Sequence, residues 1–222
     1  MSIAENIKRL KASLPASVTL VAVSKFHPVE ALREAYDAGQ RIFGESRAQE
    51  LTAKQKALPA DIEWHFIGPL QSNKVKDIAP FIHTIHSIDS LKLLKEVDKQ
   101  AAKHGRTIRV LLEIHVAQEE AKHGFTPNEC ASLLDDLPAG ALANLQFGGL
   151  MGMATNTDDP ELIRQEFRQL HTLFLALKSS RFKDDEHFRE LSMGMSHDYP
   201  LAIDEGSTMI RVGSSIFGER EY

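Results

Sequence analysis

The chain has 222 residues, of which 42% are hydrophobic and 26% are charged, and its net charge at pH 7 is −5. These values are ordinary for a globular protein, and the acidic balance gives no basic surface for nucleic acid. The single cysteine, Cys130, excludes a disulfide framework and a thiolate zinc site within one chain. We see neither a signal-peptide core nor an apolar stretch that could span a membrane, and we therefore expect a cytoplasmic protein.

The first two predicted elements are a helix and a buried strand. Residues 1–14 have apolar side chains at helical spacing, which predicts an amphipathic helix ahead of the main fold. In residues 18–25, VTLVAVSK, six of the first seven are apolar or β-branched, which is typical of a strand buried on both faces. This strand would end on Lys25, and Pro28 is well placed as the first residue of the next helix.

Strands and helices then alternate along the rest of the chain. Seven further strands are predicted at 41–45, 62–68, 82–88, 108–116, 145–153, 190–195 and 208–213. Helices are predicted at 29–36, 46–57, 72–79 (capped by Ser72), 91–101, 158–177 and 200–206, with another that begins near 126. Eight such alternations predict a (β/α)8 TIM barrel that uses residues 1–222 as a single domain. A doubly wound open sheet is the main alternative.

Lys25 is the first candidate for chemistry. The carboxyl ends of barrel strands form the active-site face, and a partly desolvated lysine there can lose its proton and attack a carbonyl. The simpler interpretation is a lysine that reaches solvent at the end of a strand.

Two loops near the end of the chain carry the second candidate site. Residues 192–196, SMGMS, and 211–218, RVGSSIFG, combine glycines with hydroxyl side chains after the seventh and eighth strands. In barrels these two loops commonly bind phosphate, although glycine and serine also fill ordinary turns. A lysine opposite a phosphate site suits a phosphorylated aldehyde, such as pyridoxal 5′-phosphate (PLP) or a sugar phosphate.

The histidines of the predicted strands raise the question of a metal. His83 and His86 are three residues apart and would point to opposite faces of their strand. With no helix-spaced pair and no cysteine partner, we expect no metal site. His65 should face inward near the ligand, where packing against a cofactor is favoured over acid–base work.

Several blocks of the sequence together resemble the pyridoxal phosphate homeostasis protein family. The resemblance runs in order from about residue 5 to the end of the chain, in the blocks 21–25 (VAVSK), 43–45 (FGE), 64–74 (WHFIGPLQSNK), 149–151 (GLM), 191–196 (LSMGMS) and 211–218 (RVGSSIFG). It implies a barrel like the N-terminal domain of alanine racemase. It also implies a role in PLP supply and amino-acid balance, with no established turnover.

The resemblance further implies the residues that hold PLP. Lys25 would hold the cofactor covalently as a Schiff base, and Arg211 would lie beside the pyridine ring. The phosphate would fall on Ser196, Gly213 and Ser214. Ser46 stands where the family commonly has an asparagine near the cofactor, and His115 and His197 are further departures from the family pattern. PLP-dependent apo-enzymes are the expected partners, and we expect a monomer or weak dimer.

Two enzymatic alternatives stay open at this point. An amino-acid racemase would need a second base on the far side of the substrate, and Tyr199 is the only plausible one. A Schiff-base aldolase acting on a sugar phosphate would need an acid–base partner near Lys25 and would carry no chromophore.

Overall fold

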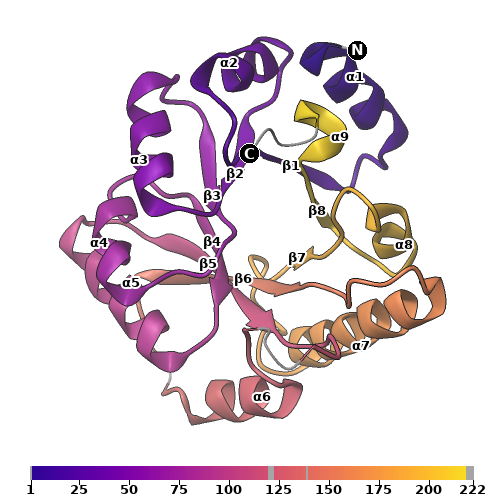
Figure 1. The fold of residues 1–222 in the computed structure, drawn as a ribbon. Helices are drawn as coiled ribbons and strands as arrows, with labels where there is room; N and C mark the ends of the chain where they lie inside the picture. The colour runs from indigo at the N-terminus through magenta and orange to yellow at the C-terminus, as the bar shows by residue number, and fades with distance from the viewer. Residues whose placement is uncertain (1, 120–122, 139, 219–222) are drawn as a thin grey trace.

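Eight parallel strands close into one barrel in chain order. The computed structural model describes residues 2–119, 123–138 and 140–218. The strands pair with their neighbours from β1 to β8, and β1 pairs with β8 to complete the ring (Figure 1). Their bounds are β1 Thr19–Val23, β2 Ile42–Glu45, β3 Glu63–Phe66, β4 Thr84–Ile88, β5 Ile108–Ile114, β6 Leu145–Gly152, β7 Glu190–Ser192 and β8 Met209–Val212.

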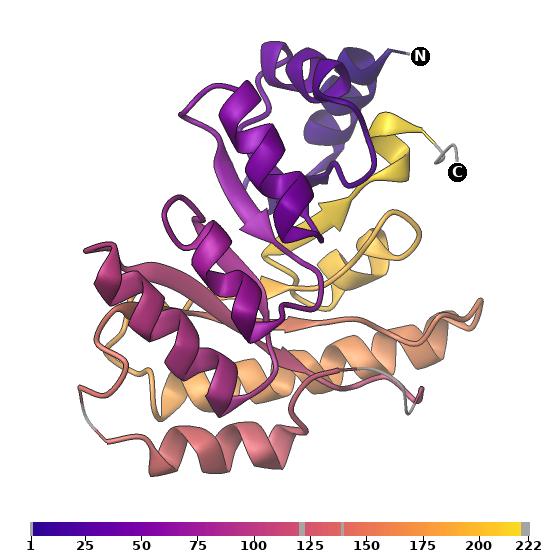
Figure 2. The same cartoon turned by 60° about the vertical axis from the view of Figure 1, so that its left-hand side comes forward.

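Helices surround the strands on the outside, as Figures 1 and 2 show. Most of them connect one strand to the next and cover its outer face. Their bounds are α1 Ile3–Ser13, α2 Val29–Asp37, α3 Ala48–Ala57, η1 Ser72–Lys74 (a 3-10 turn), α4 Val75–Ile78, α5 Leu91–Lys103, α6 Pro127–Asp136, α7 Pro160–Ser179, α8 Tyr199–Asp204 and α9 Ser214–Phe217.

The predicted TIM barrel is confirmed, and the order of all eight strands with it. The pairing of Leu20 with Ile210 joins the first strand to the last, which rules out an open sheet. Strand ends are the main differences. The first strand stops at Val23, so Lys25 lies in the turn that follows it and not in the strand. Pro28 caps α2 from outside the helix and is not its first residue.

One predicted helix start is wrong. Ser72 does not cap a helix, because it is itself the first residue of the turn η1. The capping position belongs to Gln71, whose side chain makes no capping hydrogen bond. A serine before an apolar run is a good sequence signal for a cap. Here the helical segment after β3 begins with a 3-10 turn, and the α-helix follows it.

Helix α1 precedes the barrel and packs beside its last helix. Its start is a capping box in which Ser2 and Glu5 accept each other's backbone N–H groups. The Asn6 side chain donates to the carbonyl of Ile216 in α9 at 3.0 Å. Ile7 and Leu10 bury the apolar side of α1. The first helix therefore supports the segment that follows β8.

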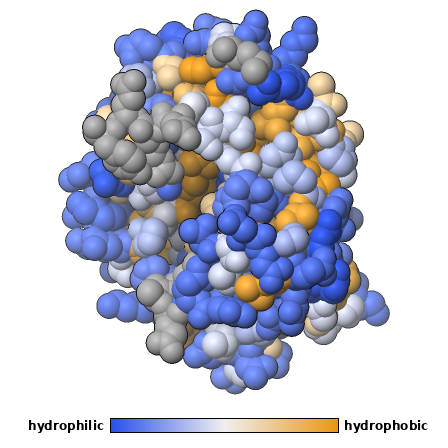
Figure 3. All heavy atoms as spheres, turned by 45° about the vertical axis from the view of Figure 1, so that its right-hand side comes forward, coloured by the Kyte–Doolittle hydropathy of each residue, from blue (hydrophilic) through white to orange (hydrophobic). Residues whose placement is uncertain are grey.

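The hydrophobic core lies mainly between the strands and the helices. Phe43, Phe66, Phe167 and Phe188 are among its largest buried side chains. The buried polar residues include several histidines, serines and charged groups from the strands. The face drawn in Figure 3 is mostly hydrophilic, and apolar residues show chiefly between polar ones. No helix among the described residues is long and apolar enough to cross a membrane.

Gly149 allows β6 to approach β7. Its φ of +146° lies in a region that side chains rarely adopt. A Cβ atom added there would lie 1.8 Å from the carbonyl oxygen of Glu190. Only glycine permits this backbone contact, which brings the start of β7 into line beside β6.

Candidate functional site

A cavity of about 270 Å³ opens at the carboxyl ends of the barrel strands. It gathers residues that follow β1, β6, β7 and β8, which are far apart in the sequence but adjacent around the barrel. A lysine, an arginine and two serines line it together with apolar side chains. The lining residues are Val23, Lys25, His27, Ile67, Met153, Met195, Ser196, His197, Arg211, Gly213, Ser214 and Gly218.

Lys25 lies in a turn whose two flanking residues are held by one network of hydrogen bonds and ion pairs, which is buried at Lys54 and Glu45. The Lys54 ammonium donates to the carbonyl of Ser24, the residue before Lys25, at 2.7 Å. The residue after it, Phe26, donates its backbone N–H to Glu50 at 2.6 Å. Phe26 has a φ of +70°, an unfavourable conformation for a side chain of this size. The Glu50 hydrogen bond holds that turn in place, and with it the backbone of Lys25.

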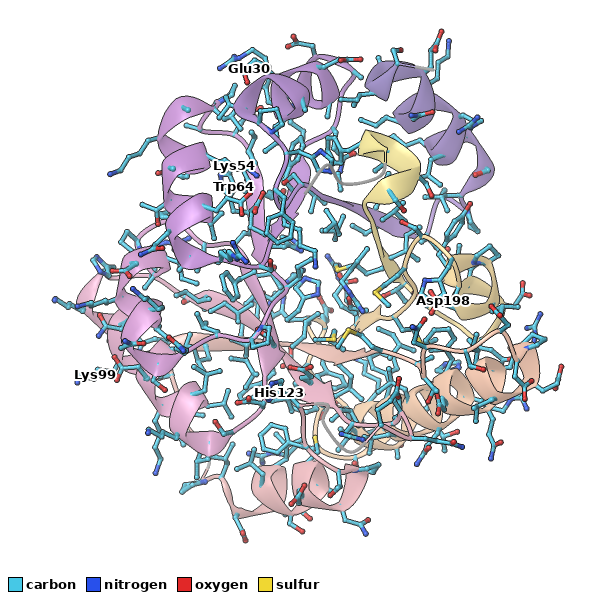
Figure 4. All side chains as sticks on the ribbon, viewed as in Figure 1. Glu30, Lys54, Trp64, Lys99, His123 and Asp198 are labelled. Carbon is cyan, nitrogen blue, oxygen red and sulfur yellow. The ribbon has the colours of Figure 1, made fainter. Side chains whose placement is uncertain are left out.

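The centre of this network is an ion pair between Lys54 and Glu45. Their side chains lie 2.8 Å apart and are almost fully buried. Lys54 points from α3 toward the barrel, as Figure 4 shows. It also pairs with Glu50 at 2.7 Å, and Ser24 donates its hydroxyl to Glu45 at 2.6 Å. Burial raises the pKa of the Glu45 carboxyl, and the charge of Lys54 opposes that shift.

The opposite side of the cavity presents hydroxyl and backbone N–H groups. Gly213 donates its N–H to the Ser196 hydroxyl at 3.2 Å, which ties the loop after β7 to the loop after β8. Helix α9 begins at Ser214, and the N–H groups of a helix's first turn have no partner within the helix. The loop after β7 is itself fixed, because Met195 donates its N–H to the buried Asp198 at 2.6 Å.

Arg211 reaches the floor of the cavity from β8 and is held firmly. One of its terminal nitrogens donates to both the hydroxyl and the carbonyl of Ser192, at 2.7 and 2.8 Å. The other donates to the carbonyl of Gly152 at 3.1 Å. Burial lowers the pKa of Arg211 to about 10, so the guanidinium is charged at neutral pH. A pairing of Arg211 with Asp204 or Glu205 is not found, since both carboxylates bind arginines of α7.

A chain of hydrogen bonds runs from Arg211 deeper into the barrel. Ser192 contacts Nδ1 of His86 at 3.0 Å, and Nε2 of His86 contacts Nδ1 of His65 at 2.9 Å. The donor at each ring nitrogen depends on the tautomer. Burial lowers the pKa of both histidines well below the usual value, and nearby positive charges add to the shift. Both rings are therefore neutral at pH 7.

Five of the seven predicted site residues line this one cavity: Lys25, Ser196, Arg211, Gly213 and Ser214. Ser46 and His65 do not line it. Ser46 borders a separate hollow with Arg47 and Pro69, because the chain bends outward at the end of β2. His65 is buried in β3, and its ring bonds to His86.

The network around Lys54 escapes sequence reasoning, and so does the anchoring of Arg211 by Ser192. Lys54 resembles any other lysine of an amphipathic helix, and only the fold shows that its face of α3 is buried. The sequence groups Ser192 with the loop after the seventh strand, which suits phosphate. Its hydroxyl instead lies deeper in the barrel and accepts a hydrogen bond from Arg211. The one available signal was Glu45, a carboxylate at the end of a buried strand, since such a group needs a partner.

Comparisons with protein families, with curated proteins and with solved structures agree with one another. The family described as "Alanine racemase, N-terminal domain" matches residues 1–221. A pyridoxal phosphate homeostasis protein of Pasteurella multocida is 41% identical over 212 residues, which are 93% of this chain and 88% of that protein. The solved structure of PipY of Synechococcus elongatus with PLP bound has a TM-score of 0.87 and 40% identity, and the match covers 98% of this chain and 100% of PipY.

More distant structures share the fold alone. Alanine racemase of Streptomyces lavendulae is 19% identical with a TM-score of 0.78, and the match covers 99% of this chain but 57% of the racemase. The barrel and its cavity thus define a TIM-barrel protein of the alanine racemase type. At the carboxyl ends of its strands it has a lysine and glycine- and serine-containing loops that suit phosphate. The chain belongs to the alanine racemase N-terminal domain family and, within it, to the pyridoxal phosphate homeostasis proteins.

The network that flanks Lys25 yields a stability prediction. Lys54→Met should lower the free energy of unfolding by about 3–5 kcal/mol, because it leaves the buried Glu45 carboxyl without its partner. The matched control is Lys56→Met, which replaces an exposed lysine of the same helix. This substitution should change the free energy of unfolding by less than about 0.5 kcal/mol. Urea denaturation measures both values, and equal effects of the two substitutions would refute the structural role of Lys54.

The buried histidines yield a prediction about pH. His86 is neutral in the folded protein and titrates at the higher, ordinary pKa once unfolded, so the stability it supports is complete above about pH 6.5 and is lost as pH falls. The difference in free energy of unfolding between the wild type and His86→Gln, here called the stability gap, should therefore shrink below that pH. It should shrink by up to about 1.4 kcal/mol per pH unit.

Urea denaturation from pH 7.5 to 5, in the presence of EDTA, measures this gap. His104→Gln changes an exposed histidine at the end of α5 and serves as the control, with a gap that stays constant. A constant gap for His86→Gln as well would contradict the neutral, buried imidazole.

Proposed function

We propose that this protein binds PLP in the cavity at the carboxyl ends of its strands and serves intracellular PLP homeostasis and amino-acid balance. The observation that carries this proposal is the convergence on one cavity of Lys25, Arg211 and the Ser196–Gly213 pair. An amine, a fixed cation and a cluster of hydroxyl and N–H donors suit the aldehyde, ring nitrogen and phosphate of PLP. Val23, Ile67, Met153 and Met195 give the cavity apolar walls for a ring. The relative with PLP in its solved structure supports the same conclusion.

Lys25 would hold the cofactor covalently. Its Nζ attacks the aldehyde carbon once it has lost a proton, a C=N bond forms and one water leaves. Lys25 is half-buried at the rim of the cavity, and the bonds to Ser24 and Phe26 fix its backbone. A fixed backbone limits the conformational entropy that is lost when the side chain is held in one position.

Ser196, Gly213 and Ser214 would bind the phosphate. They lie where the loops after β7 and β8 meet, and the hydrogen bond from Gly213 to Ser196 holds the loops together. Serine hydroxyls and the N–H groups at the start of α9 are the donors that a phosphate dianion requires.

Arg211 would face the ring nitrogen and keep the bound cofactor a weak catalyst. Three hydrogen bonds to Ser192 and Gly152 fix the guanidinium, which is charged at neutral pH. A fixed positive charge disfavours protonation of the neighbouring pyridine nitrogen. PLP supplies electron withdrawal from a bound amino acid, and an unprotonated ring withdraws electrons less strongly.

Racemisation is disfavoured because none of the described tyrosines lines the cavity. Tyr199, the expected substitute for a second base, lies in α8 beside Gly194. Tyr36 donates its hydroxyl to Asp61 at 2.8 Å. Tyr222 lies outside the described residues. The cavity therefore suits binding of PLP and delivery to PLP-dependent apo-enzymes more than turnover.

The covalent assignment predicts a loss of colour. Lys25→Ala should abolish the visible absorption of the PLP-loaded protein, whereas Lys74→Ala should retain it, because Lys74 does not line the cavity. Borohydride reduction followed by peptide mass mapping should place the label on Lys25 in the wild type. A label on Lys74, or an unchanged band in Lys25→Ala, would overturn the assignment.

The phosphate assignment predicts that pyridoxal binds far more weakly than PLP. Charge-assisted hydrogen bonds contribute roughly 1.5–3 kcal/mol each, so the loss of even one should weaken binding by about tenfold or more. Ser214→Ala should weaken PLP binding in fluorescence titrations. Ser46→Ala, which changes a serine outside the cavity, should not. Equal affinities for PLP and pyridoxal would refute this phosphate site.

A further inference from the structure

A second group of potential ligands lies at the other end of the barrel. Glu63 is the first residue of β3, His65 follows two residues later, and His83 directly precedes β4. Among the described residues, these three form a group whose potential metal-binding atoms all lie within 4.8 Å of one another. The cavity with Lys25 lies at the carboxyl ends of the strands, so this group is separate from it.

The geometry of the group is close to that of a bound ion. Nε2 of His83 lies 3.6 Å from a carboxylate oxygen of Glu63. Ligands of tetrahedral Zn²⁺ at their usual bond lengths are about 3.4 Å apart, so this pair is already near the required spacing. Because all the ligand atoms lie within 4.8 Å of one another, the other pairs need to approach by at most about 1.4 Å. Glu63 and His83 have side chains that are 48% and 41% exposed and can make it.

His65 supplies an independent indication that a ligand belongs there. Only 2% of its surface is exposed, and its Nε2 makes no hydrogen bond. A buried polar atom without a partner is unfavourable by about 1–3 kcal/mol. A metal ion would satisfy this nitrogen, and its neighbours His83 and Glu63 would complete the coordination.

The other nitrogen of each ring is already bonded. Nδ1 of His65 lies 2.9 Å from His86, and Nδ1 of His83 lies 2.8 Å from the Thr84 hydroxyl. Histidines that bind metals usually donate their second N–H to a partner, which fixes the tautomer and the ring orientation. With the proton on each Nδ1, both Nε2 atoms carry the lone pair that a metal requires.

Charges of both signs lie near the group. Arg109 repels an incoming cation, but it is held by Gln146 and Glu190, and Glu63 brings a negative charge into the group itself.

The expectation of no metal site rested on His83 and His86 pointing to opposite faces of one strand. His83 lies outside β4, and its ring stacks on His65 at 5.6 Å between ring centroids. His86 also contacts the His65 ring, at 5.0 Å between ring centroids. The relevant pair is therefore His65 in β3 and His83 just before β4, which strand alternation within one segment does not reveal.

We propose that Glu63, His65 and His83 form a binding site for a divalent transition metal, with Zn²⁺ as the natural occupant. Two imidazoles and one carboxylate suit Zn²⁺ and leave a fourth position for water. Such a ligand set with only one carboxylate oxygen donor does not suit Ca²⁺ or Mg²⁺. The ion would stabilise the amino-terminal end of the barrel, where it would join β3 to the start of β4.

Titration calorimetry with ZnCl2 tests this site on the full chain after treatment with EDTA and removal of the chelator. The wild type should bind one Zn²⁺ per chain. His83→Ala and Glu63→Gln change partly exposed side chains and should each weaken binding by about tenfold or more. His104→Gln removes an exposed histidine that is not one of the three proposed ligands and should leave the affinity unchanged.

The result that overturns the proposal is either an absence of saturable binding in the wild type or an equal affinity in His83→Ala and Glu63→Gln. Co²⁺ provides a second measurement, because tetrahedral coordination by nitrogen and oxygen gives visible d–d absorption. That absorption should be present in the wild type and lost in His83→Ala. Lys25→Ala should bind Zn²⁺ and Co²⁺ like the wild type, so this test does not depend on PLP binding.

Discussion

The buried pair of Glu45 and Lys54 is the constraint on which the candidate site depends. It joins helix α3 to the end of β2, and through Ser24 and Glu50 it fixes the turn that carries Lys25. Two charges taken out of water are strongly unfavourable unless they satisfy each other and their neighbours. Here Lys54 makes three short contacts, so it is satisfied only when β1, β2 and α3 are all in place. A single lysine in a helix thus couples the packing of the barrel wall to the geometry of the cavity.

Arg211 shows the same principle in β8, on the other side of β1. Its donors are directed at Ser192 and Gly152, which belong to the two preceding strands. The guanidinium is therefore positioned before any ligand arrives, and a ligand has to adapt to it. Below Arg211, His86 and His65 continue the chain of hydrogen bonds into the barrel. Polar side chains, and not apolar ones, therefore fill this part of the barrel interior. Such an interior suits a protein that orients a ligand by fixed dipoles and charges.

The sequence could predict the barrel and the residues of its cavity because both depend on local patterns. Buried strands read as apolar runs, and glycines and serines after the last two strands mark a loop. It could not place Lys54, Ser192 or the His65–His83 pair, because their partners come from other strands and helices. Ser46 and His65, which we expected near the ligand, do not line the cavity, and the reason is related. Sequence position along a strand indicates the face a residue takes, but depth in the barrel depends on where the strand begins, and β3 begins at Glu63.

The contact between α1 and α9 has a consequence for synthesis of the protein. Lys25 emerges from the ribosome long before Ser214, and the pairing of β1 with β8 brings the two sides of the cavity together. The bond from Asn6 to Ile216 then fastens the first helix over that junction. A nascent chain consequently presents Lys25 without its surrounding cavity until β8 has been synthesised. The cavity assembles around this lysine only after β8 has paired with β1.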